Sequence, residues 1–187
     1  VAFLGNHLTL DNTIPPFDGL SGTLEFSEQG RALRNLQATF LGGPLKVEGE
    51  TPEPGRFALR AQGRIDADGM RGVVDNPLTR RLSGATDYQA RIDVARRAAS
   101  MSIESDLHGL SSALPAPFDK PADARWPLRV QTTAQPPGDP KSRSMRDTIR
   151  VELRDATRLL LERVRDLRTE KLLIQRGAFA IDAEPAL

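Results

Sequence analysis

The chain has 187 residues, enough for one large β domain or two small ones with a hydrophobic core. Its 26 basic and 25 acidic residues leave a formal net charge of +1, so it has no basic field to draw it onto nucleic acid. It contains no cysteine, which excludes disulfide scaffolds, thiol catalysis and cysteine-based zinc sites.

The two ends of the sequence predict a piece of a longer protein. The chain begins without Met, at Val1, in residues with strand character, and it ends at Leu187 without a polar tail. No stretch approaches the roughly 20 consecutive apolar residues of a membrane-spanning helix.

Apolar and polar residues alternate with a period of two in the first third of the chain, which is typical of half-buried strands. In the first such run, Leu20, Gly22, Leu24 and Phe26 share one face. Turn residues rich in Gly and Pro separate the runs. The predicted strands cover 20–27, 36–40, 45–48 and 57–64, and strands joined by such short turns predict an antiparallel meander.

Residues 66–82 interrupt the alternation. Asp68 could cap a short helical turn, and Asn76 followed by Pro77 is a typical helix start. We therefore expect one short helical insert near 66–82, packed over an end or a face of the sheet.

Strand alternation returns at 87–94, 101–107 and 126–130. The Pro-rich stretch 114–127 is expected to be irregular, because Pro supplies no donor to a strand ladder. Residues 135–144 form a polar loop, where we expect flexibility.

The segment from Arg150 to Gln175 fits two structures. Ile149, Val151 and Leu153 alternate as in a strand, but the later leucines also suit one face of a helix. Propensity alone favours a helix here.

Residues 20–26 recur loosely as residues 82–88, which hints at a repeated β unit. The chain is therefore either a single β-rich unit over 1–187 or two β repeats, about 1–65 and 83–187, joined by the helical insert.

No set of residues has the spacing of a catalytic or metal site. His7 and His108 lack a second ligand nearby, and the carboxylate pairs 48/50 and 66/68 suit a solvated strand face or turn. We therefore predict no catalytic residue, no metal, no cofactor and no enzymatic activity.

The apolar strand faces have two interpretations. They form the core of a closed sandwich, as in a structural or assembly module, or they stay partly uncovered and accept acyl chains. For the second interpretation the candidate residues come from four successive strands and should form one continuous face, with Phe40 near its rim. They are Leu24, Phe26, Leu36, Phe40, Leu45, Val47, Phe57 and Leu59.

Several motifs resemble the central region of the YhdP family, AsmA-like proteins of Gram-negative bacteria. The most distinctive run is Ser105-Asp-Leu-His-Gly-Leu110, followed by Leu114-Pro-Ala-Pro117, Lys120-Pro-Ala122 and Pro127-Leu-Arg-Val130. Residues 20–26, 40–44 and 176–178 are further points of similarity, so the resemblance covers nearly the whole chain.

The resemblance implies an all-β fold with a curved antiparallel sheet, either a taco-like groove or an open sandwich. It implies strands at 157–164 and 171–181, with a turn at 166–169. It further implies a periplasmic protein, anchored in the inner membrane by a helix outside this chain, that carries phospholipid toward the outer membrane. The implied partners are phospholipid acyl chains and other repeats of the same chain, with membrane contact through parts outside it and no nucleic acid.

Overall fold

The computed structural model describes residues 1–9, 15–27, 30–53, 55–95, 98–135, 144–154, 156–166, 168–169 and 171–185. The helices are α1 (Ala67–Val73) and the 3-10 turn η1 (Thr79–Arg81). The strands are β1 (Ala2–Leu8), β2 (Phe17–Ser27), β3 (Gly30–Phe40), β4 (Gly43–Glu53), β5 (Arg56–Asp66), β6 (Leu82–Ala95), β7 (Ala98–Ser105), β8 (Leu110–Ala113), β9 (Asp119–Lys120), β10 (Leu128–Gln135), β11 (Ser144–Leu153), β12 (Thr157–Asp166) and β13 (Leu172–Ile181).

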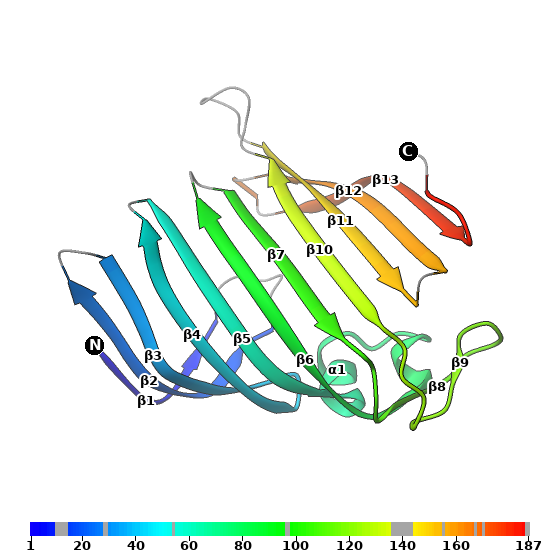
Figure 1. The fold of residues 1–187 in the computed structure, drawn as a ribbon, viewed down its shortest axis with the longest axis horizontal. Helices are drawn as coiled ribbons and strands as arrows, with labels where there is room; N and C mark the ends of the chain where they lie inside the picture. Colours follow the sequence, from blue (N-terminus) through cyan, green and yellow to red (C-terminus); the bar gives the residue numbers. More distant parts are fainter. Residues whose placement is uncertain are drawn as a thin grey trace.

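The strands form one antiparallel sheet that does not close on itself (Figure 1). Neighbours follow the chain from β1 to β7, and β10 then takes the place beside β7 before β11, β12 and β13. Strands β8 and β9 leave this path, with β8 paired to the start of β6. The predicted all-β fold with an antiparallel meander is therefore confirmed.

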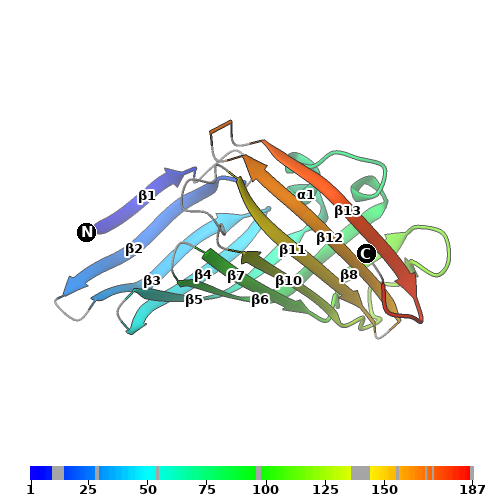
Figure 2. The same cartoon turned by 90° about the horizontal axis from the view of Figure 1, so that it is seen from above.

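The sheet is bent into an open trough, with β1 and β13 along its two rims (Figure 2). We call the concave face the inner face and the convex face the outer face. Strands β2, β4, β6, β10 and β12 all end at one side, which we call the distal end. Helix α1 lies at the opposite side, the helix end, where β5 ends and β6 begins.

Strand register sorts side chains cleanly between the two faces. A cross-strand row on the inner face is apolar over nine strands: Leu36, Val47, Ala61, Ala90, Ile103, Val130, Val151, Leu159 and Phe179. The side chains of the adjacent cross-strand row point to the outer face, and this row is mostly polar: Gln37, Lys46, Gln62, Gln89, Glu104, Arg129, Glu152, Arg158 and Ala180. This sorting follows directly from the period-two alternation in the sequence.

The most buried part of the inner face lies toward the helix end. Leu45, Tyr88 and Ala90 form the core cluster there, with Leu45 only 5% exposed. Phe17 and Phe40 pack against this cluster and stack on each other, with ring centroids 4.8 Å apart. Because the trough is concave, side chains of one sheet bury one another without a second sheet above them.

Helix α1 is fixed against the turn between β3 and β4. The Asp66 carboxylate caps the helix by accepting the Gly69 N–H at 2.5 Å, and the Asp66 N–H donates to the Leu41 carbonyl at 3.3 Å. The approach is so close that a Cβ at Gly69 would overlap the Leu41 carbonyl. The predicted helical insert near 66–82 is therefore present, and it packs over one end of the sheet.

The ambiguous segment from 150 to 175 is strand, as the family resemblance implied and against helix propensity. β12 pairs with β11 over ten residue pairs and with β13 on its other side. The Asp166 carboxylate accepts the N–H groups of Arg168 and Thr169 at 2.8 and 2.9 Å, which fits the predicted turn. Most of the loop predicted at 135–144, residues 136–143, lies outside the described residues.

Candidate functional site

The inner face is the candidate site. The register places Leu36 of β3 opposite Val47 of β4. It also aligns one residue from each of four successive strands in a second row on the same face: Leu24, Leu33, Gly49 and Leu59. All eight predicted groove residues therefore lie on one continuous face. Their exposure differs widely, from 5% for Leu45 to 61% for Phe26. A role for these residues in binding lipid stays a prediction.

Phe40 lies in a different place from the one expected. Its ring stacks on Phe17 and packs against the core cluster, so it belongs to the core of the trough rather than to its rim. Phe26, near the end of β2 at the distal end, is the exposed phenylalanine of the predicted set.

The sequence prediction missed the larger part of this face. Strands β6, β7 and β10 to β13 continue it with residues such as Ile92, Ile103, Val151 and Phe179. The same alternation was visible at 87–94 and 149–153. The missing information was the pairing of β7 with β10 across an excursion of more than twenty residues, which joins the two halves of the face.

Nothing in the described part of the chain forms a second layer over the inner face. Helix α1 lies at the helix end on the concave side (Figure 2). Phe118, from the segment between β8 and β9, lies beside Phe179 of β13 with ring centroids 6.4 Å apart. Large apolar side chains remain exposed on this face at Phe26, Val94, Ile174, Phe179 and Ile181. A closed sandwich would have covered them, so the open sheet provides an uncovered apolar strip of the kind that marks interaction surfaces.

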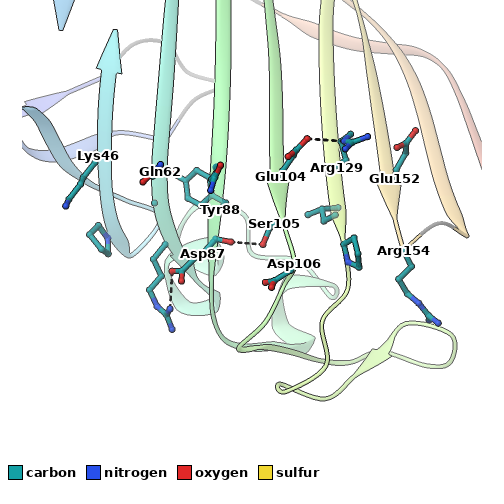
Figure 3. A pocket seen from close by; sticks show the side chains of 16 residues that line it. Lys46, Gln62, Asp87, Tyr88, Glu104, Ser105, Asp106, Arg129, Glu152 and Arg154 are labelled. Atoms are coloured by element: carbon teal, nitrogen blue, oxygen red, sulfur yellow. Dashed lines mark hydrogen bonds and ion pairs between the residues drawn. The ribbon is translucent and has the colours of Figure 1, made fainter. Parts of the chain in front are cut away.

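The outer face carries a shallow hollow of about 830 Å³ near the helix end, and half of the residues that line it are charged (Figure 3). These charges pair across strands, with Arg64 3.1 Å from Asp87 and Arg129 3.2 Å from Glu104. The side chains involved are about half exposed or more, so the pairs contribute little to stability. This hollow is a solvated strand face with neutralised charges.

The two histidines do not assemble a catalytic or metal site. His7 Nδ1 lies 2.6 Å from Asp18 Oδ1 on an exposed part of the sheet. Among the residues that the structure describes, no group of three His, Asp or Glu side chains could hold a metal ion.

The distinctive motif at 105–130 has a structural role. Its Lys120 is 4% exposed, and its Nζ donates to the carbonyls of Leu110 and Pro121 at 2.7 and 3.1 Å. Burial lowers the pKa of this amine. The guanidinium of Arg154 lies 4.7 Å from the centroid of the Trp126 ring, so the motif is also attached to the turn after β11. These contacts hold the β8–β9 excursion against the sheet.

Asp106 in this motif predicts a pH-dependent stability. Its carboxylate accepts the His108 N–H at 3.0 Å and pairs with Arg125, and these interactions lower its pKa below the usual 3.8. The ionised form is therefore favoured by folding, and its stabilisation is present above pH 3.8 and lost as the pH falls through the lowered pKa. Thermal melts of the chain and of Asp106→Asn should differ at pH 7 and converge once the pH has fallen below the lowered pKa of Asp106. A difference that persists unchanged in acid would contradict this assignment.

Neither helix of the described ranges has the length and apolar composition needed to cross a bilayer. No curated protein and no solved structure matches the chain. The sequence model of the YhdP protein family matches residues 1–186. That match covers almost the entire chain and agrees with the open, curved β sheet described above. The chain therefore belongs to the YhdP family of AsmA-like envelope proteins.

Proposed function

We propose that this chain is a non-enzymatic, periplasmic segment of an inner-membrane-anchored protein, and that its trough carries phospholipid acyl chains toward the outer membrane. Membership of the YhdP family and the open apolar face support the proposal. The inner membrane anchor belongs to a part of the protein outside this sequence.

The observation that carries the proposal is the apolar cross-strand row that runs over nine strands without a charged residue. An acyl chain on this surface leaves water at about 0.8 kcal/mol per methylene, so several methylenes bind without any polar contact. A surface without directional groups also lets the chain move from one strand to the next.

The edges of the sheet support a role for further repeats. β1 and β13 are the edge strands of the sheet, and each pairs with only one strand of the described chain, so its other edge is free. Strands from other repeats of the same protein can pair there and extend the trough in both directions. A continuous surface of this kind would let a lipid move without leaving the protein.

The test compares neighbours on opposite faces of β7. Met101 lies on the inner face and Ser102 on the outer face. The chain is incubated with phosphatidylethanolamine vesicles, reisolated and analysed by native mass spectrometry. We expect bound lipid on the unmodified chain and on Ser102→Glu, and its loss from Met101→Glu, because an acyl chain cannot solvate a carboxylate.

Lipid that stays bound to Met101→Glu would place the binding surface elsewhere. An unmodified chain that never carries lipid would favour the structural or assembly module. Circular dichroism and thermal melts of both variants serve as the control for folding.

A further inference from the structure

Charge on the inner face is confined to the distal end. The register places four charged side chains of the described main-sheet strands on this face, and all lie within five residues of a strand terminus at that end: Arg31, Asp147, Arg163 and Arg165. From these residues to the helix end, the inner faces of β11 and β12 carry Ile149, Val151, Leu153, Thr157, Leu159 and Leu161. The inner faces of these strands are therefore charged at one end and uncharged along the rest.

Asp147 and Arg163 form a two-pronged ion pair across β11 and β12. Arg163 Nε lies 2.8 Å from Asp147 Oδ1, and Nη2 lies 2.6 Å from Oδ2. Their side chains are only 20% and 23% exposed, whereas those of Glu104 and Arg129 on the outer face are 57% and 53% exposed. The pair is thus largely withdrawn from water, at the border between the charged end and the uncharged part of the inner face.

Stability alone gives a weak reason for such a pair. Removing two charges from water costs free energy, and apolar side chains of similar volume often hold two elements together equally well. A guanidinium has five N–H donors, of which a two-pronged carboxylate pair uses two, and its planar shape suits phosphate. A cation beside an anion also complements a ligand that carries both charges.

We propose that Arg163 and Asp147 bind the headgroup of a zwitterionic phospholipid, with the guanidinium toward the phosphate and the carboxylate toward the ammonium group. The acyl chains then extend from there toward the helix end. This inference rests on the proposed function and adds to it the headgroup class and the orientation of the lipid.

The length of the apolar surface agrees with this orientation. Arg163 and Thr157 are six residues apart on β12, which is about 20 Å at about 3.3 Å per residue. One leaflet contributes about half of the roughly 30 Å hydrocarbon thickness of a bilayer. The inner face of β12 is therefore long enough to cover an acyl chain whose headgroup lies at Arg163.

The test uses phosphatidylcholine that carries a nitroxide either near the ester carbonyl or near the end of one acyl chain. Each lipid is added to the chain with isotope-labelled methyl groups, and nuclear magnetic resonance reports which methyl signals broaden. We expect the ester-end label to broaden Ile149 and Leu161 more strongly, and the terminal label to broaden Leu153. Leu160, which faces outward beside Leu161, should broaden less than Leu161 with the ester-end label.

The variant Asp147→Leu with Arg163→Met should keep the lipid but remove its orientation, so both labels broaden both ends of the strands. Asp147→Asn with Arg163→Gln gives the same test with polar side chains if the first variant fails to fold. Glu104→Leu with Arg129→Met, on the outer face, is the matched control and should preserve the orientation.

A reversed or missing gradient in the unmodified chain would overturn this inference while leaving lipid carriage intact. A gradient that survives the loss of the Asp147–Arg163 pair would overturn it as well. No broadening with either lipid would instead overturn the proposed function itself.

Discussion

Replacing Gly69 with Ala should destabilise the chain, even though Ala favours helices over Gly. A Cβ at this position would overlap the carbonyl of Leu41, a backbone group that cannot rotate away. Relieving the overlap moves α1 off the β3–β4 turn and disturbs the bond between the Gly69 N–H and the Asp66 carboxylate. Overpacking of this kind costs about 1–3 kcal/mol. In a chain of this size, that corresponds to a fall in Tm on the order of 5 °C.

Gly72→Ala is the matched control. Gly72 lies in the same helix, but nothing is within 4 Å of the Cβ that the substitution would add. Here the helix propensity of Ala acts alone, so thermal melting should show no loss and up to about 1 kcal/mol of gain. Equal effects of the two substitutions would show that the contact between α1 and the turn does not hold the helix end together.

The sequence was informative wherever local pattern determines structure. Alternation at 20–27, 45–48 and 57–64 predicted the strands and assigned their inward residues to one face, because a strand exposes alternate side chains to opposite sides. The break in alternation correctly marked the region of the helical insert, but Asp66 caps its helix, not the expected Asp68 or Asn76. These features depend on residues within a few positions of each other.

Features that depend on distant contacts could not be predicted in this way. Leu159, Leu160 and Val164 suit a helix by propensity, and they form a strand because β11 and β13 supply ladder partners on both sides of β12. The pairing of β7 with β10 is equally invisible to local pattern. Asp147 and Arg163 lie sixteen residues apart, and only the register of two strands brings their charges together on the apolar face.

The packing of Phe40 also could not be predicted from the sequence. The alternation identified it as an inward residue, but it gave no measure of burial along the strand. The stack on Phe17 and the contact with the core cluster decide how a substitution there will behave. Of the same predicted set, Phe40 therefore tests the stability of the trough, and Phe26 tests its exposed apolar surface.

Phe40→Glu should unfold the chain or nearly so. The substitution removes an aromatic ring that packs against the core cluster, a loss of about 3–5 kcal/mol by itself, and it places a carboxylate against that cluster. Native domains are stable by only about 5–15 kcal/mol, so a large fall in Tm should appear in calorimetry. Phe26→Glu should leave Tm close to that of the unmodified chain, since the Phe26 side chain is 61% exposed and its replacement stays in water.

The two variants also separate folding from lipid binding. Because Phe26 lies on the inner face near the distal end, a carboxylate there should reduce the lipid retained in native mass spectrometry while the fold stays intact. Thr23→Glu, on the outer face of the same strand, introduces the same charge without facing the trough and should retain lipid. A stable Phe40→Glu variant would show that the stack with Phe17 is not part of the core. Full lipid retention by Phe26→Glu would confine the lipid surface to strands beyond β2, since a desolvated carboxylate beside an acyl chain has no compensating partner.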